Sequence, residues 1–189
     1  ISLLSATHDG IEYKVVVRES FCATFLARLR YTLFPSRARQ NWIGARALRV
    51  RGIPTPDALA LVEYRSGLLS KRSLLFTRYI EGACELNEYV LSRYGGVLSP
   101  ATRKQKKRFI QTLAELIRDI HAKGIYHADM KSNNILVRED GDAWKLFIID
   151  LDRVRFRKSL SFTQRANNLA QINASVAACI TPADRISFF

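Results

Sequence analysis

One polar stretch between two apolar runs holds the side chains of this sequence that could carry out a reaction. The stretch reads GIYHADMKSNNILV and contains His127, Asp129, Lys131 and Asn134. Asp150 follows sixteen residues after Asn134, at the end of the apolar run LFIID. A carboxylate can take the proton of a hydroxyl, a carboxylate and an amide oxygen can hold a divalent metal ion, and an ammonium group can balance phosphoryl charge. These residue types therefore indicate the transfer of a phosphoryl group to a hydroxyl.

The spacing of the loop residues, H-x-D-x-K-x-x-N, matches the catalytic loop of kinases, and the later aspartate matches their metal-binding strand end. We therefore predict Asp129 as the catalytic base, Lys131 as the contact to the γ-phosphate, and Asn134 and Asp150 as metal ligands. His127 is predicted to form structural hydrogen bonds instead of carrying the proton. A solvated surface loop is the alternative interpretation, but a chance match to this four-position pattern in a chain of this length has a probability of about 1 in 1000.

Helical and strand periodicity predicts the elements that must position this loop. A helix is expected over residues 99–124, with Ser99 as its N-cap, Pro100 in its first position and apolar residues along one face. After the loop, two strands joined by the turn EDGD form a hairpin, which is expected to bring the loop and Asp150 together. The segment RANNLAQINASVAAC over residues 165–179 predicts a final helix.

The first part of the chain predicts a small sheet with one helix. Two extended runs within residues 1–19 are joined by the dipeptide DG, which is typical of tight hairpin turns. A helix is expected over residues 36–50, and a second hairpin follows from residues 57–64 and 72–80. A short helix over residues 84–96 then opens a mostly helical part.

The predicted fold class is therefore α+β, with two lobes. The N-lobe spans residues 1–82 and the C-lobe, which carries the loop and the metal site, spans residues 83–189. The chain begins without methionine and ends without a helix stop signal, so both ends are expected to be cut from a longer protein.

The composition restricts the class of protein and of partner. The chain has 189 residues, of which 48% are hydrophobic and 25% are charged, which fits a folded protein rather than a disordered one. A net charge of +13 predicts an anionic partner such as a phosphorylated substrate, an anionic membrane surface or nucleic acid. Three separated cysteines indicate neither a disulfide framework nor a zinc site, and no apolar run reaches the roughly 20 residues of a membrane span. A reducing, cytoplasmic location is expected.

The motifs together resemble one family. GIYHADMKSNNILV followed by LFIIDLDRVRF, with RGIPTPDALA, LLFTRYIEGA and NNLAQINAS, is similar to the bacterial lipopolysaccharide kinase family, from about residue 13 to residue 189. The resemblance implies a protein-kinase-like two-lobed fold, ATP and Mg²⁺ as cofactors, and phosphorylation of Kdo or heptose in a lipid-linked inner-core saccharide. It also implies a cytoplasmic enzyme that works at the inner membrane face, in peripheral contact with an anionic membrane surface. By the same resemblance, Asp152 belongs to the metal-site strand end, where it could bind a second metal ion or pair with Arg153 or Arg155.

The nucleotide site departs from the protein-kinase pattern. The strand lysine of V-A-I-K is replaced by Arg18 in VVVR, with Lys14 on the same strand face. Residues 20–56 contain no Asp or Glu that could pair with Arg18 from the predicted helix, and no Gly-rich phosphate loop is visible. ATP is still expected in a cleft whose hinge is lined by Tyr79 and Ile80.

Two other kinds of function stay open beside a sugar kinase. The departures at Arg18 fit a degenerate kinase fold that binds nucleotide or a partner without transfer. Protein kinase activity is an alternative within the enzyme class, although no APE-like segment follows Asp150. Nucleic-acid binding is disfavoured because no recognition motif accompanies the basic charge.

Overall fold

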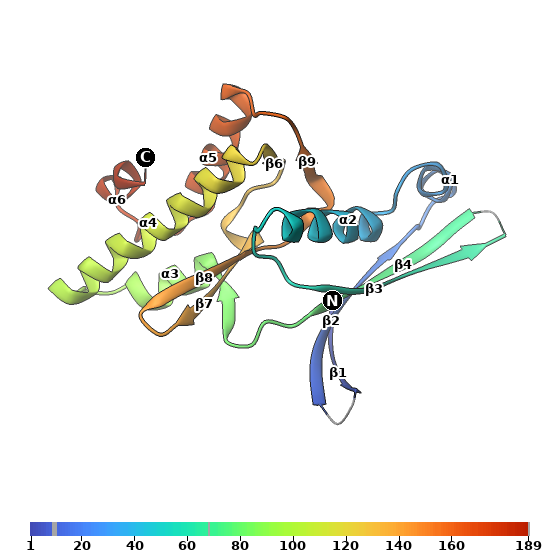
Figure 1. Ribbon diagram of the computed structural model, residues 1–189, viewed down its shortest axis with the longest axis horizontal. Helices are drawn as coiled ribbons and strands as arrows, with labels where there is room; N and C mark the ends of the chain where they lie inside the picture. Colours follow the sequence, from blue (N-terminus) through green and yellow to red (C-terminus); the bar gives the residue numbers. More distant parts are fainter. Residues whose placement is uncertain (9–10, 68, 189) are drawn as a thin grey trace. The chain divides into compact units, whose positions relative to one another are not determined.

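The computed structural model describes residues 1–8, 11–67 and 69–188 (Figure 1). The chain divides into two compact units. Unit 1 comprises Ile1–Ile80 together with Asp150–Arg153, and unit 2 comprises Glu81–Ile149 together with Val154–Phe189. The chain thus changes unit near residue 80, and the short segment after the metal-site strand belongs with the N-terminal residues.

Unit 1 is built on a four-stranded antiparallel sheet with the strand order β1-β2-β4-β3. The strands are β1 Ser2–His8, β2 Ile11–Phe21, β3 Ala58–Ser66 and β4 Leu69–Arg78. Both predicted hairpins are present as strand pairs, although the Asp9-Gly10 dipeptide of the first lies outside the described residues.

Helix α2 (Arg37–Val50) confirms the helix predicted over residues 36–50. Its first turn is capped by Ser36, whose Oγ accepts a hydrogen bond from Arg39 N at 3.1 Å. Ala38, Ala45 and Leu48 are buried along one face, as helical spacing requires.

The expectation of a single helix in this part of the chain was wrong, because a second helix, α1 (Phe25–Leu33), precedes α2. Its Leu, Ala and Arg residues are strong helix formers. The helix packs on β4, where Thr32 Oγ1 accepts a hydrogen bond from Ser70 N at 3.0 Å.

Unit 2 contains two small sheets and four helices among its described residues. The sheets have the orders β5-β7-β8 and β6-β9 and are antiparallel. The strands are β5 Ala83–Glu85, β6 Ile125–His127, β7 Ile135–Asp140, β8 Ala143–Ile148 and β9 Val154–Phe156, and the helices are α3 Leu86–Tyr94, α4 Pro100–Ala122, α5 Phe162–Ser175 and α6 Pro182–Ser187. The helix α6 was not predicted.

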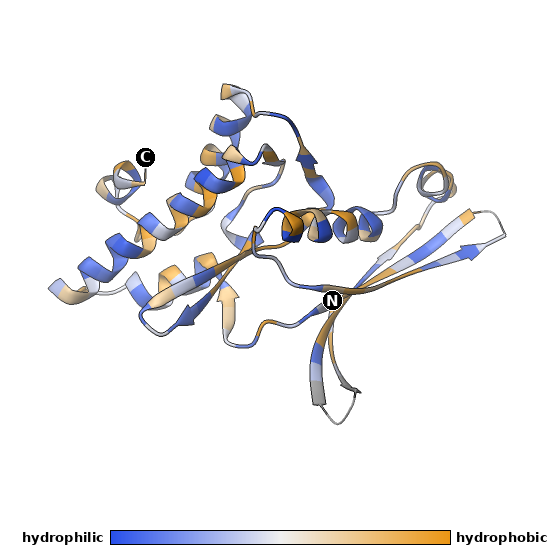
Figure 2. Cartoon of the chain, in the orientation of Figure 1, coloured by the Kyte–Doolittle hydropathy of each residue, from blue (hydrophilic) through white to orange (hydrophobic). Residues whose placement is uncertain are grey.

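Helix α4 organises the core of unit 2. Ser99 caps it through a hydrogen bond from Thr102 N at 3.1 Å, as predicted. Phe109, Leu113 and Ile117 are buried on one face, and Figure 2 shows hydrophobic and hydrophilic residues alternating along the helix. None of the helices in the described residues is both long enough and apolar enough to span a bilayer.

Candidate active site

The predicted catalytic loop connects two short elements of unit 2. It follows strand β6 and ends in a 3₁₀ turn over Ser132–Asn134, directly before β7. Gly124 starts this path with φ of 67°, and a Cβ there would lie 2.0 Å from Arg157 O, so only glycine fits between α4 and β6. Glycine geometry therefore sets the path into β6, which leads directly into the loop.

Asp129, Lys131 and Asn134 are gathered by this loop. Lys131 Nζ lies 2.7 Å from Asp129 Oδ1, and the Asp129 side chain is about one quarter exposed. Asn134 Nδ2 donates a hydrogen bond to Asp129 O at 2.8 Å. Because the amide nitrogen of Asn134 is used in this bond, its Oδ1 is the atom available to bind a cation. The three loop residues with predicted catalytic or metal-binding roles thus lie close together in one loop.

His127 has the structural environment that the sequence analysis expected. Its side chain is buried, and its Nδ1 accepts a hydrogen bond from Asp129 N at 3.2 Å. Because Nδ1 is an acceptor in a neutral ring, Nε2 carries the proton and donates to Ile149 O at 3.1 Å. The imidazole therefore ties the catalytic loop to the residue before Asp150.

Helix α5 holds the same loop from the other side, a feature that the sequence analysis missed. Gln171 accepts a hydrogen bond from Met130 N at 2.9 Å and donates one to Ala128 O at 3.0 Å. One turn later, Ser175 Oγ accepts a hydrogen bond from Ser132 N at 2.8 Å.

Asn168 completes this support from α5. It is fully buried, and its Nδ2 donates to His127 O at 2.6 Å while its Oδ1 lies 3.3 Å from His121 Nε2. Burial is the largest cause that lowers the pKa of His121, which favours the neutral ring. Asn168, Gln171 and Ser175 follow the spacing i, i+3, i+7 and so share one helix face. That polar spacing in NNLAQINAS was the signal that could have revealed them.

Replacing Gln171 with methionine keeps the side-chain length but removes both hydrogen bonds to the loop backbone. We expect kcat for phosphoryl transfer to fall about 10- to 100-fold with a small change in KM for ATP, because the base is displaced while nucleotide binding is not. Steady-state kinetics measure this split. The control is Gln111→Met, an exposed glutamine on α4, which should change neither constant. If the Gln171 and Gln111 variants lose the same kcat and the same thermal stability, Gln171 has no positioning role.

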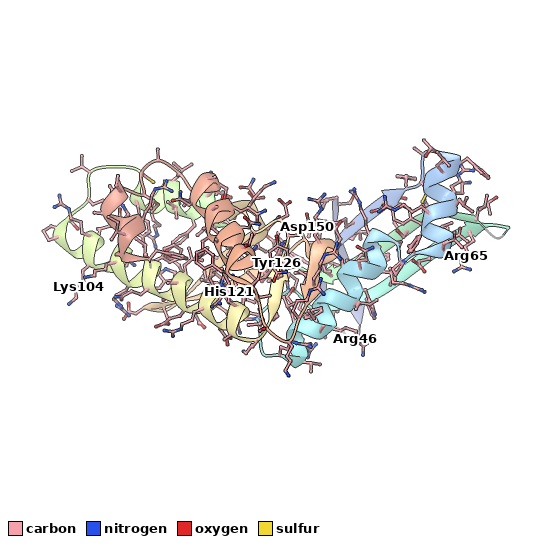
Figure 3. The ribbon with its side chains drawn as sticks, turned by 90° about the horizontal axis from the view of Figure 1, so that it is seen from above. Arg46, Arg65, Lys104, His121, Tyr126 and Asp150 are labelled. Carbon is pink, nitrogen blue, oxygen red and sulfur yellow. The ribbon has the colours of Figure 1, made fainter. Side chains whose placement is uncertain are left out.

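Unit 1 carries the second part of the predicted site (Figure 3). Asp150 has φ of 60°, the left-handed region that few residues other than glycine adopt. Its carboxylate forms an ion pair with Arg18 of strand β2. The segment is held to α2 because Leu151 N donates to Asn41 Oδ1 at 2.6 Å. Arg18 thus has a carboxylate partner, supplied by Asp150 and not by a helix.

The sequence analysis considered an ion pair of Asp152 with Arg153 or Arg155, but the structure pairs Asp152 with another arginine. Its Oδ2 lies 3.8 Å from Arg37 Nε, because the turn that contains Asp152 packs against α2, which begins at Arg37. Burial is the largest cause that raises the pKa of Asp152, with the charge of Asp150 second. The arrangement leaves its role as a second metal ligand a prediction.

The other predicted nucleotide residues also belong to unit 1. Tyr79 N donates to Lys14 O at 2.9 Å, so the residue directly after β4 is still hydrogen-bonded to β2, and Ile80 ends this unit. Their roles in holding ATP, like that of Lys14, stay predictions.

The donor set suits Mg²⁺ in chemical type. Asn134 and Asp150 offer an amide and a carboxylate oxygen, and Mg²⁺ in kinases is held by one or two such groups together with substrate phosphates. The described part of the chain has no cluster of three or more His, Cys, Asp or Glu side chains suited to a metal ion. A site in which ATP phosphates supply some of the metal ligands does not need such a cluster. Asn134 and Asp150 belong to different units, and their sharing of one ion stays a prediction.

Comparison with known proteins decides the family. Residues 13–189 match the family described as lipopolysaccharide kinase (Kdo/WaaP) family. The chain belongs to this family. Its relatives include the lipopolysaccharide core heptose(I) kinase WaaP of Pseudomonas aeruginosa, which is 27% identical over 156 residues, or 80% of this chain and 57% of WaaP. A 3-deoxy-D-manno-octulosonic acid kinase of Stenotrophomonas maltophilia is 33% identical over 108 residues, or 57% of this chain and 37% of that enzyme.

A solved structure confirms the predicted fold for this member of the family. The structure described as WaaP in complex with acyl carrier protein aligns with a TM-score of 0.68 and 24% identity, over 98% of this chain and 71% of that one. The α+β, kinase-like fold is thus shared. The chain spans about half the length of the curated relatives that it matches.

Proposed function

We propose that this chain forms part of an ATP-dependent kinase that phosphorylates a sugar hydroxyl of the lipopolysaccharide inner core, either on Kdo or on heptose. The observation that carries the proposal is the loop geometry, in which Lys131 Nζ lies 2.7 Å from the Asp129 carboxylate. A base and a cation this close suit a step in which a hydroxyl loses its proton while phosphoryl charge needs neutralising. Membership of the kinase family supports the same reaction.

The roles of the residues follow from their contacts. The Asp129 carboxylate would accept the proton of the sugar hydroxyl, and Lys131 would bind oxygens of the γ-phosphoryl group. Asn134 and Asp150 would hold Mg²⁺, which supplies charge neutralisation to the phosphates of ATP. Ile149 N donates to Asn134 O at 2.9 Å, so the backbone that continues into Asp150 is held beside Asn134.

The location of the reaction follows from the substrate. A lipid-linked saccharide and ATP meet at the cytoplasmic face of the inner membrane, so we propose a cytoplasmic protein in peripheral contact with that surface. The net charge of +13 supports contact with anionic lipids, since each Lys or Arg near such a surface contributes about 1 kcal/mol.

The test is transfer of label from γ-labelled ATP, with Mg²⁺, to purified inner-core saccharides that end in Kdo or in heptose. A generic protein substrate is included in parallel, and reactions are run with and without acyl carrier protein, since the solved WaaP is described in complex with it. Label in one saccharide supports the proposal and identifies the sugar. Label only in protein would favour a protein kinase, and ATP binding without label in either acceptor would favour a degenerate kinase.

A further inference from the structure

Helix α1 of unit 1 exposes its apolar residues. Phe25, Leu26, Leu29 and Leu33 are 65%, 75%, 40% and 70% exposed, and we call these four residues the α1 apolar face. Phe25, Leu29 and Leu33 follow the spacing i, i+4, i+8, and Leu26 lies on the same side of the helix. The residues therefore form one continuous stripe on the surface of the unit.

The polar residues of α1 are the ones that attach it to the sheet. Thr32 Oγ1 accepts a hydrogen bond from Ser70 N of β4 at 3.0 Å, and Arg28 Nε donates to Cys22 O at 3.3 Å. A surface helix of a globular protein normally has the opposite orientation, with its apolar side against the core. The helix is thus anchored with its apolar stripe turned to solvent. Two more exposed aromatic residues are close in the chain: Phe21, the last residue of β2, at 67%, and Phe34, directly after α1, at 63%.

Positive charge dominates the chain segment that contains this stripe. Residues 20–56 contain seven arginines and no Asp or Glu. Arg30 lies on α1 itself and is exposed. Arg65 of β3, which Figure 3 labels, is also exposed, and its strand partner Ser70 donates to Thr32 of α1. Some of the seven are partly neutralised from elsewhere in unit 1, since Arg39 and Arg49 form ion pairs with Glu63 and Asp57. The partner of this surface must therefore accept apolar side chains and carry negative charge.

We infer that α1 is the element that docks unit 1 on an anionic lipid surface, with the α1 apolar face inserted among the acyl chains and arginines at the headgroups. A lipid surface admits a convex helix stripe without a matching groove, and Phe and Leu flanked by Arg are the composition of interfacial helices. Large exposed apolar patches, especially those rimmed by polar residues, mark interaction sites in proteins. The inference deepens the membrane contact proposed above and rests on it, but it does not depend on phosphoryl transfer.

Sedimentation with vesicles tests the inference. The whole chain is mixed with vesicles of phosphatidylcholine alone or of phosphatidylcholine with phosphatidylglycerol, without ATP. The variant carries Phe25→Ser, Leu29→Ser and Leu33→Ser together, and we expect its partition coefficient on anionic vesicles to fall at least about tenfold. The matched control carries Val97→Ser and Phe162→Ser, which removes exposed apolar residues of unit 2, and should bind as the parent does.

A second variant removes charge and not apolar area. Arg30→Gln should weaken binding to anionic vesicles and reduce its sensitivity to salt, with no effect on the low binding to neutral vesicles. In a Leu29→Trp variant, tryptophan fluorescence should shift to the blue on anionic vesicles and should be quenched by brominated lipid. Both effects are measured relative to the parent with its native tryptophans.

The outcomes separate this inference from the proposed function. Equal vesicle binding by the parent and the triple serine variant would overturn the role of α1 while leaving membrane contact in place. A parent chain that binds no anionic vesicle would overturn both, whereas transfer to a soluble saccharide would still be measured separately. If the parent binds no vesicles but self-associates or binds acyl carrier protein, and the triple variant loses that binding, the α1 apolar face would be a protein-binding surface and the lipid proposal would be overturned.

Discussion

Replacing Asp129 with asparagine is expected to lower kcat for phosphoryl transfer by about 10³-fold while leaving the fold and ATP affinity nearly unchanged. Asparagine keeps the size of the side chain but cannot accept the hydroxyl proton. The Asp129 backbone remains held, because its N–H bonds to His127 Nδ1 and its carbonyl to Asn134 Nδ2. Lys131 loses its carboxylate partner but keeps its charge for phosphate.

Steady-state transfer to the saccharide identified above measures this effect, and ATP affinity is followed by calorimetry. Asp140→Asn is the matched control, since Asp140 is exposed at the end of β7 and should behave as the parent does. Full activity in the Asp129 variant would show that another group accepts the proton. A similar loss in both variants would point to damage of the fold.

Replacing Asp150 with asparagine is expected to reduce kcat by about 10²- to 10³-fold and to raise the Mg²⁺ concentration needed for half-maximal rate. The carboxylate is the stronger of the two predicted ligands, so its neutralisation weakens the site for a hard cation. Asparagine is the informative choice because Asp150 has φ of 60°, which asparagine tolerates, whereas alanine would add about 1–2 kcal/mol of backbone strain.

The ion pair of Arg18 with Asp150 needs its own control. Glu19→Gln breaks the pair of Arg72 with Glu19 at 3.0 Å, in the same sheet, and should leave the Mg²⁺ dependence unchanged. An unchanged Mg²⁺ dependence in the Asp150 variant would remove Asp150 from the metal site. The expected result would also explain how Arg18 can replace a strand lysine, because Arg18 would be shared between Asp150 and the nucleotide phosphates.

The local elements were predictable because short-range rules specify them. Ser99 and Pro100 mark the start of α4 through capping chemistry and proline geometry, and the structure begins the helix there. Helix α1 was not predicted although Phe25, Leu29 and Leu33 have helical spacing, because the helix has only nine residues and short apolar runs are ambiguous between helix and strand.

The amino-acid sequence by itself determined which residue types are present and which of them share a loop, because Asp129, Lys131 and Asn134 are joined by a few peptide bonds. Only the tertiary structure decided their long-range partners. The pairing of Arg18 with Asp150 spans 132 positions, and Gln171 reaches Met130 across 41. Such contacts depend on packing between elements, which no local periodicity encodes. The sequence therefore showed only that the predicted helix offers Arg18 no acid, and it did not indicate that Arg37 is the ion-pair partner of Asp152.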